Sequence, residues 1–209
     1  PPAYRCAITA PEGEQREATL RYYESCIALA AGLGCDRLVL DASGACWDRK
    51  DELLWRSAAD TLYHLCPAAQ AAGVRLLLAP VMGAETPLIA ESPILNTAAE
   101  LDAMLHQLNH PSLGVCLDTN IMSACGDTVY DWFGRFRDKI GLVRLCDGNY
   151  HGWRAWGEGV LPMQRYLHAL DAMGYRGDIS LRLPGERYLA QPAYPDERAL
   201  AALCGEVGA

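Results

Sequence analysis

The chain has 209 residues, 51% of them hydrophobic and 21% charged, which is ordinary for a folded α/β domain. Its net charge of −8 argues against a general nucleic-acid binder, because such proteins need clustered positive charge to displace counterions from phosphates. No apolar run approaches the roughly 20 residues that cross a bilayer and the first residues lack a signal-peptide pattern, so we expect a cytoplasmic protein that does not enter a membrane.

Short runs rich in β-forming residues alternate with longer segments of helical period along the whole chain. This alternation is typical of parallel strands joined by crossover helices. No long linker or change of composition divides the chain, so we predict one domain over residues 1–209. The predicted strands lie near residues 4–9, 37–41, 75–79, 114–118, 141–146 and 179–183, and the predicted helices near 14–31, 50–72, 97–108, 128–137, 163–173 and 195–207.

Nine cysteines are scattered along the chain without a C-x-x-C pair or zinc-ligand spacing. We expect free thiols, several of them buried in strands and helices as small apolar side chains. Cys146 lies at the end of a predicted strand, near the presumed site. A nucleophilic Cys146 is the less favoured interpretation, because a reactive thiolate needs an activating environment.

A series of short motifs runs in a fixed order from Glu14 to about Leu200. The motifs are Arg16-Glu17, Gly34-Cys35, Gly73-Val74-Arg75, Leu117-Asp118-Thr119, Asp147, Gly157-Glu158-Gly159 and Gly174-Tyr175-Arg176-Gly177. Each motif alone is weak, but at these spacings they together resemble the xylose isomerase-like TIM-barrel superfamily of ketose 3-epimerases and sugar isomerases. The segment around residues 157–159 is most similar to the fructoselysine 3-epimerase branch.

The resemblance implies a (β/α)8 TIM barrel, which has eight strands and typically about 250 residues. In the resembling family, two strand–helix units precede the one that residues 4–9 match. We therefore expect an α/β partial barrel that lacks its first two β/α units. Either those units are missing from this sequence or come from a partner, or the barrel has an open seam with exposed strand edges.

The resemblance also implies proton transfer beside the carbonyl of a ketose, assisted by a divalent cation. Relatives hold the cation with a glutamate, an aspartate, a histidine and a second glutamate, each at the end of a strand. The matching positions here are Ala79, Asp118, Arg144 and Arg182. Arginine cannot ligate a metal, because it has no free lone pair and stays protonated. Asp118 is thus the remaining catalytic carboxylate and metal ligand, and we expect this remnant to bind no metal.

A cation site rebuilt from loop residues is the alternative. If the family mechanism persists, the cofactor is a divalent ion such as Mn, Mg, Co or Zn, and further oxygen ligands have to come from the loops. We favour the absence of a cofactor. The candidate replacement ligands are Asp41, Glu85, Asp147, His151, Glu158 and Glu186.

Arg144 and Arg182 admit two interpretations. Both can fill the vacated cation position by pairing with Asp118, in which case burial requires a closely paired cluster. Alternatively, one guanidinium is free to clamp a carboxylate or phosphate of a small ligand with its planar pair of donors. Arg75, on an earlier strand, is a further candidate for the same interior.

The connection that follows residue 146 is rich in aromatic and polar side chains. Aromatic residues at a barrel mouth often stack on sugars, but they also pack long loops against the protein. Glu158 is expected to be a structural hydrogen-bond partner and not a catalyst. The candidate substrate-binding residues are Arg144, Arg182, Asp147, His151 and Trp153.

Two classes of function therefore remain open. The first is a sugar epimerase or isomerase that acts on a ketose through an enediolate. The second is a non-catalytic protein that binds a sugar or an anion, or a subunit that needs a partner chain. In each case the expected ligand is a small sugar or anion and not a nucleic acid, and a homo-oligomer is compatible with the sequence.

Overall fold

A computed structural model describes residues 6–83, 91–149, 152–183 and 187–205. It divides into two compact units, the first formed by Pro1–Cys116 with Phe136–Gly141 and the second by Leu117–Arg135 with Leu142–Ala209. The single domain expected over residues 1–209 stays a prediction. Among the helices of the described ranges, none combines the length and the apolar character that a membrane crossing requires.

The first unit contains parallel strands with helices between them. Arg37 pairs with Arg75 across β1 and β2, and Leu76 pairs with Leu113 across β2 and β3. The strands β2 and β3 consist largely of buried residues, as expected for parallel strands covered by helices. The strands are β1 (Arg37–Leu40), β2 (Arg75–Leu78) and β3 (Leu113–Asp118), of which the last two residues belong to the second unit.

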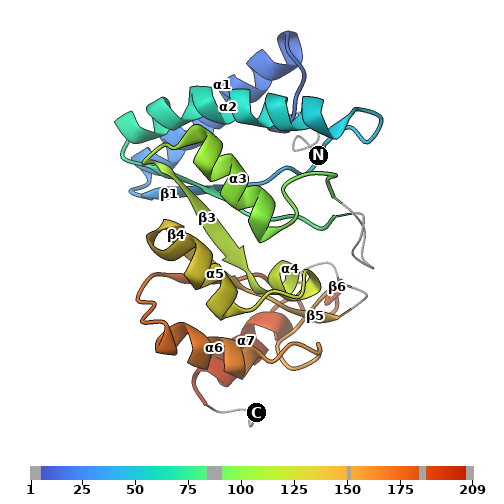
Figure 1. Ribbon diagram of the computed structural model, residues 1–209. Coiled ribbons are helices and arrows are strands. Elements are labelled where there is room, and N and C mark those ends of the chain that lie inside the picture. Colours follow the sequence, from blue (N-terminus) through green and yellow to red (C-terminus); the bar gives the residue numbers. More distant parts are fainter. Residues whose placement is uncertain (1–5, 84–90, 150–151, 184–186, 206–209) are drawn as a thin grey trace. The chain divides into compact units, whose positions relative to one another are not determined.

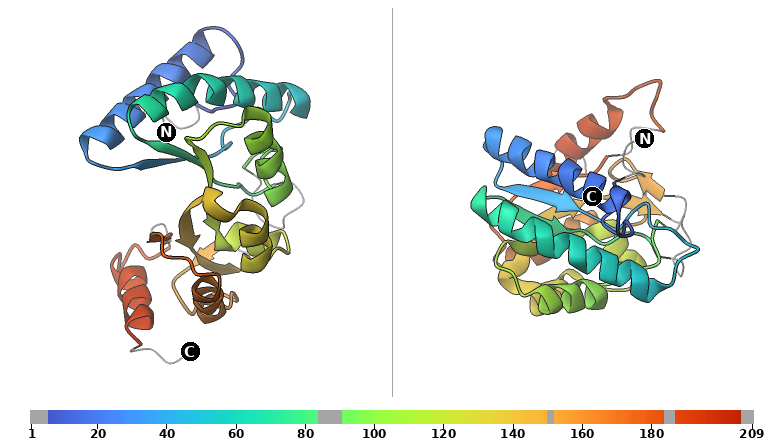
Figure 2. Two further views of the ribbon diagram at one scale, coloured as in Figure 1. Left: turned by 60° about the vertical axis from the view of Figure 1, so that its left-hand side comes forward. Right: turned by 90° about the horizontal axis from the view of Figure 1, so that it is seen from above.

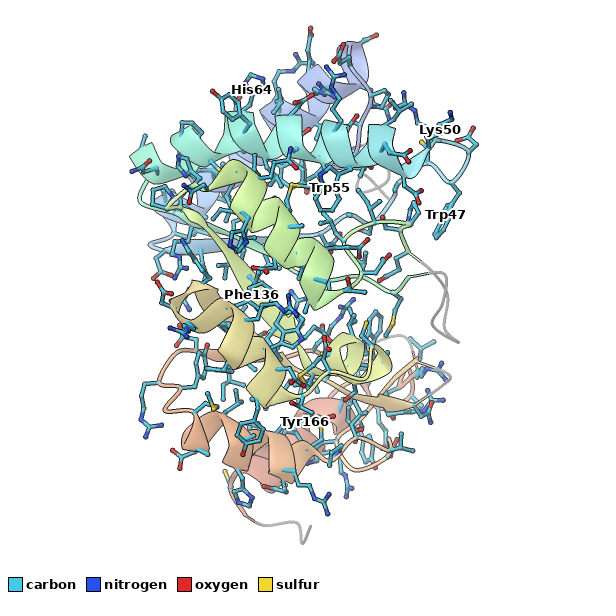
Figure 3. The ribbon with its side chains drawn as sticks, in the orientation of Figure 1. Trp47, Lys50, Trp55, His64, Phe136 and Tyr166 are labelled. Carbon is cyan, nitrogen blue, oxygen red and sulfur yellow. The ribbon has the colours of Figure 1, made fainter. Side chains whose placement is uncertain are left out.

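The helices of the first unit lie next to one another. Helices α1 and α2 are side by side in the views of Figures 1 and 2. Trp55 of α2 donates its Nε1–H to Gln107 Oε1 of α3 at 2.8 Å, which ties these two helices together (Figure 3). Thr97 and Glu100 form a capping box at the start of α3. The helices are α1 (Glu14–Gly32), α2 (Asp51–Ala71), α3 (Ala98–Leu108) and the 3-10 helix η2 (Arg137–Lys139).

The second unit contains a parallel strand pair, a β-hairpin and helices. Arg144 of β4 pairs with Ser180 of β7. The hairpin pairs Gly148 with Trp153. The strands are β4 (Ile140–Leu145), β5 (Asp147–Asn149), β6 (Gly152–Arg154) and β7 (Ile179–Leu181), and the helices are α4 (Thr119–Ala124), α5 (Val129–Phe136), α6 (Met163–Ala172) and α7 (Tyr194–Leu203). The first two residues of β4 and the last residue of α5 belong to the first unit.

The predicted strands from residue 37 onward form, with ends that differ by at most two residues, and the predicted helices also form. The first predicted strand is wrong over residues 6–9, where the Ala10 N–H donates to Ala7 O at 2.9 Å and closes a turn. Pro11, which has no N–H, and Gly13, with φ of 105°, follow this turn and keep the chain from forming a strand between the turn and α1. Residues 4–5 lie outside the described ranges. The sequence did not predict α4 or the hairpin.

Arg37 and Arg75 lie at the beginning of their strands and complete the main-chain hydrogen bonding there. Arg37 Nη1 donates to Gly141 O at 2.9 Å, and Arg75 Nη2 donates to Lys139 O at 3.5 Å. A Cβ on Gly114 would lie 2.5 Å from Lys139 O, so the close approach needs glycine. The Arg75 guanidinium thus binds carbonyls near the amino end of its strand, and its predicted place in the interior of the candidate site stays a prediction.

Candidate functional site

Asp118 ends β3 and begins α4. Its side chain is completely buried, and Oδ1 accepts the backbone N–H groups of Asn120 at 3.1 Å and Ile121 at 3.3 Å. It is therefore the N-cap residue of α4, where it satisfies amides that have no partner within the helix. One carboxylate oxygen of the predicted metal ligand is used by the backbone.

The second oxygen of Asp118 meets both arginines. Arg182 Nη1 donates to Oδ2 at 3.4 Å, and Arg144 Nη1 lies 3.8 Å from the same oxygen. The Arg182 N–H donates to Leu145 O at 2.9 Å, which places Arg182 next to Arg144 at the carboxyl ends of β7 and β4. The predicted ion pairs with Asp118 are thus confirmed.

Positive charge exceeds negative charge in this cluster, because two guanidinium groups face one carboxylate. The side chains of Arg144 and Arg182 are 20% and 30% exposed, whereas Asp118 has no exposed side chain. Within the described ranges, the side chain of Arg182 donates one hydrogen bond and that of Arg144 donates none. Since a guanidinium carries five N–H donors, both residues retain donors for an anion.

Trp153 of β6 supports Arg182. The Arg182 Cζ atom lies 3.7 Å from the centroid of the Trp153 ring, a close cation–π contact. A guanidinium stacked on an aromatic face keeps its edges free, and the edges carry the N–H groups. Two of the predicted substrate-binding residues are therefore in direct contact, while their contact with a substrate stays a prediction.

The thiol of Cys146 lies beside the same carboxylate, with Sγ 3.5 Å from Asp118 Oδ2. Burial and then the charge of Asp118 raise the pKa of this thiol well above its ordinary value, although Arg182 and Arg144 act in the opposite direction. A buried, protonated thiol is a poor nucleophile at neutral pH. The contacts thus support Cys146 as a packing residue and a weak donor to Asp118.

Asp147 organises the loop after the hairpin. Its Oδ1 accepts the N–H groups of Gly148 at 2.7 Å and Leu161 at 3.4 Å, and its Oδ2 accepts those of Gly157 at 2.8 Å and Gly159 at 3.2 Å. A Cβ on Gly159 would lie 1.9 Å from Asp147 Oδ1, so only glycine fits where the loop closes over this carboxylate. The contacts of Asp147 are with backbone, and its predicted role in substrate binding stays a prediction.

Glu158 lies between the two loop glycines and binds two tyrosines. Its Oε2 accepts the Tyr188 hydroxyl at 2.5 Å, and its Oε1 accepts the Tyr194 hydroxyl at 2.7 Å. These hydrogen bonds lower the pKa of Glu158. The predicted structural hydrogen-bonding role of Glu158 is confirmed. Its tyrosine partners gave no sequence signal, because they are about 30 residues away.

A cavity of about 450 Å³ lies next to this loop, between the start of α6 and helix α7. Its lining includes Trp156, Arg165 and Arg198 but not the cluster of two arginines on Asp118. Elsewhere on α6, Tyr166 shares a hydroxyl–hydroxyl hydrogen bond with Ser123 of α4 (Figure 3). The candidate site is therefore the cluster of Asp118, Arg144 and Arg182 at the strand ends, and it is distinct from this cavity.

The described residues do not supply the ligand set of a divalent cation. Across those ranges, no group of three or more His, Cys, Asp and Glu side chains could hold a metal ion. Of the candidate replacement ligands, Asp147 holds backbone amides, Glu158 holds tyrosines, and Asp41 accepts hydrogen bonds from Ser43. Three further candidates lie outside the described ranges: Glu85, His151 and Glu186.

Comparison with known proteins agrees with this topology. A sequence model of the xylose isomerase-like TIM barrel family matches residues 2–203. A curated 3-dehydroshikimate dehydratase from Pseudomonas putida is 31% identical over 111 residues, which are 47% of this chain and 17% of that protein. The chain thus spans about a sixth of the length of this relative.

Solved structures show the same fold at low sequence identity. A D-psicose 3-epimerase solved in the presence of D-fructose is 18% identical and superposes with a TM-score of 0.79 over 97% of this chain and 74% of that chain. An IOLI protein with a bound zinc atom is 17% identical, with a TM-score of 0.75 over 94% of this chain and 71% of that chain. At these identities the likeness concerns the fold alone.

Proposed function

Because the chain belongs to the xylose isomerase-like TIM barrel family, we propose that it binds a small hydroxylated carboxylic acid through Arg144 and Arg182. The observation that carries this proposal is the charge of the cluster. Two partly exposed guanidinium groups share a single oxygen of Asp118, at 3.4 Å and 3.8 Å. A second carboxylate reduces the repulsion between the arginines and uses N–H donors that Asp118 leaves free.

Arg182 is the main anchor in this proposal. Its Cζ atom lies over the Trp153 ring, 3.7 Å from the centroid, and this contact restrains the guanidinium before a ligand arrives. A planar guanidinium can donate two parallel hydrogen bonds to one carboxylate, and each hydrogen bond to a charged group contributes about 1.5–3 kcal/mol. Arg144 adds a second positive charge next to it.

The similar proteins support a ligand that is both acidic and hydroxylated. The curated relative is a dehydratase of 3-dehydroshikimate, a cyclic hydroxy acid. The structural neighbour with the TM-score of 0.79 is an epimerase of D-psicose, a ketose. A hydroxylated acid combines the polyol character of the ketose with a charge that complements the arginines.

Metal-dependent epimerisation is the less supported function. Both oxygens of Asp118 already accept hydrogen bonds, one from the start of α4 and the other from Arg182. A cation beside Asp118 would also stand next to two guanidinium groups and be repelled by them. We therefore propose that Asp118 holds the arginines and binds no metal. The inherited role of Asp118 as a proton carrier stays a prediction.

Calorimetric titration tests the proposal with 3-dehydroshikimate and gluconate as acidic probes and D-fructose as the neutral probe. We expect an acidic probe to bind more tightly than D-fructose. Arg182→Met should raise the Kd of the acidic probe by about tenfold or more, since at least one charge-assisted hydrogen bond is lost. Arg144→Met should have a similar or smaller effect.

Arg176→Met is the matched control, because Arg176 is a surface arginine of the same unit that pairs with Asp171 at 2.9 Å. This variant removes the same charge and should leave the Kd unchanged. The proposal is wrong if neither acid binds, if D-fructose binds as tightly, or if Arg176→Met weakens binding as much as Arg182→Met. Mn-dependent epimerisation of D-fructose that is lost in Asp118→Ala would establish the epimerase function instead.

A further inference from the structure

Two connections of the second unit meet at two places. One connection starts in β6, the hairpin strand that contains Trp153, and continues through Glu158 toward α6. The other leaves β7 at Arg182 and reaches α7 through Tyr188 and Tyr194. They meet where Arg182 lies 3.7 Å from the Trp153 ring centroid and again where Glu158 accepts the two tyrosine hydroxyls at 2.5 and 2.7 Å.

We infer that Glu158, Tyr188 and Tyr194 form a clamp that positions Trp153 beneath Arg182 and thereby sets how tightly the site binds a carboxylate. The clamp is made of positioning residues, which act through Arg182 and Trp153 and do not touch the ligand. The inference rests on the proposed function, because it explains how the anchor of that site is held.

Tyr188 links the clamp directly to the strand that carries Trp153. Its hydroxyl donates to Glu158 and also accepts the N–H of Ala155 at 3.0 Å. Ala155 is completely buried and stands two residues after Trp153. A buried backbone N–H needs a partner, so the end of β6 is fixed to Tyr188. Loss of this hydroxyl therefore disturbs the backbone next to the stacked tryptophan.

Tyr194 provides the second half of the clamp at the first residue of α7. The rings of Tyr188 and Tyr194 lie 5.5 Å apart between centroids and are tilted by 33°. Burial and then the hydrogen bond to Glu158 raise the pKa of Tyr188, and the hydrogen bond to Glu158 raises the pKa of Tyr194, so both hydroxyls stay protonated donors at neutral pH. Glu158 keeps its charge there, and an ionised acceptor makes the stronger hydrogen bond.

The clamp contributes to affinity by preorganisation. A guanidinium that wanders among rotamers has to be ordered when the ligand binds, and that ordering reduces the affinity. The two connections move less freely when both the Arg182–Trp153 contact and the clamp join them than when the Arg182–Trp153 contact alone does. The Tyr→Phe variants keep the ring packing and remove the hydroxyl, so they release the clamp with little loss of burial.

The test uses protein labelled with 5-fluorotryptophan, in which the ¹⁹F resonance of residue 153 is assigned by comparison with Trp153→Phe. We expect Tyr188→Phe and Tyr194→Phe to move this resonance toward its position in Arg182→Met, where the stacked cation is absent. The Kd of the acidic probe should rise by about threefold to tenfold, as expected for one hydrogen bond. Glu158→Gln should have a smaller effect, since the amide retains one acceptor oxygen.

Tyr130→Phe is the matched control, because Tyr130 is an exposed tyrosine of the same unit on α5. It should leave both the resonance and the Kd unchanged. A resonance of residue 153 that moves in Arg182→Met but stays fixed in both clamp variants overturns the inference. If no acid binds the unaltered protein, the proposed function fails, while the ¹⁹F comparison still decides whether the clamp positions Trp153.

Discussion

Each unit carries a pair of arginines on neighbouring parallel strands, and the two pairs have different partners. Arg37 and Arg75 begin β1 and β2 and donate to backbone carbonyls of residues 138–141, and Arg37 also donates from Nε and Nη2 to the carboxylate of Asp36, at 2.6 and 3.0 Å. Arg144 and Arg182 lie at the carboxyl ends of β4 and β7 and share the carboxylate of Asp118. In the first unit both arginines therefore bind main-chain carbonyls and Arg37 has a carboxylate of its own, whereas in the second unit two arginines share one carboxylate.

The difference teaches how to separate structural from binding arginines. A carbonyl is neutral, and an arginine whose N–H groups donate to carbonyls holds a segment of the chain in position. Two arginines that share one carboxylate retain a positive charge and N–H donors that this carboxylate does not use. The Trp153 ring, 3.7 Å from Arg182, restrains one of the two arginines. The carboxyl ends of parallel barrel strands are also where barrel enzymes bind their ligands. Both arguments favour the second pair as the binding site.

Removal of Asp118 should have the largest effect on stability. Asp118→Ala leaves two neighbouring guanidinium groups without their shared partner and removes the cap of α4. We expect the free energy of unfolding to fall by about 3 kcal/mol, the lower end of the range for a broken buried pair, because the arginines are partly exposed. Denaturant unfolding measures this. Asp118→Asn keeps the cap and should lose less, and equal stability of the alanine variant would contradict the cluster.

Each unit has a buried cysteine, and the reactivity of the two thiols allows the interiors of the units to be compared. Burial raises the pKa of Cys66, in the first unit, to about 11. At pH 8 this reduces its thiolate by about a hundredfold relative to a thiol of pKa 9, so Cys66 and Cys146 should alkylate far more slowly than exposed Cys35. Asp118→Asn should lower the pKa of Cys146 and speed its alkylation while Cys66 is unaffected. Peptide mass spectrometry after timed alkylation tests both statements.

Gly114 tests how tightly the structural arginine end is packed. In Gly114→Ala the new Cβ would lie 2.5 Å from Lys139 O and 2.8 Å from Arg75 Nη2, so the backbone has to shift. We expect a loss of about 2 kcal/mol, typical of overpacking. Gly134→Ala in α5 is the control, since its Cβ meets nothing within 4 Å and alanine favours a helix. Equal thermal stability of the two variants would contradict the close approach.

The smallest expected effect concerns Arg75 itself. Arg75→Met removes long hydrogen bonds to Asp138 O and Lys139 O, at 3.4 and 3.5 Å, and should lower stability by about 1 kcal/mol or less. Affinity for the acidic probe should not change. An Arg75→Met variant that weakens binding as strongly as Arg182→Met would remove the distinction between the two pairs.

The alternation of strands and helices was readable from the sequence because apolar periodicity and glycine stops are local signals. The pairing of Asp118 with Arg144 and Arg182 was also foreseen as one of two alternatives, from the family positions of these residues. The sequence did not predict that Asp118 caps α4, that Asp147 accepts four backbone amides or that Glu158 accepts two tyrosine hydroxyls. These contacts join residues that have no periodic relation, and a side chain's choice among several partners is made only when the chain has folded.

By itself, the sequence determined the family and the parallel α/β architecture, and it predicted that arginines stand at two metal-ligand positions. It could not say whether those arginines were satisfied by protein, because that depends on how many donors remain after every neighbour is in place. Tertiary structure decided this by placing one buried carboxylate between two partly exposed guanidinium groups and a tryptophan beneath one of them. Among the described residues, the excess of one positive charge in this cluster is therefore a property of the folded chain.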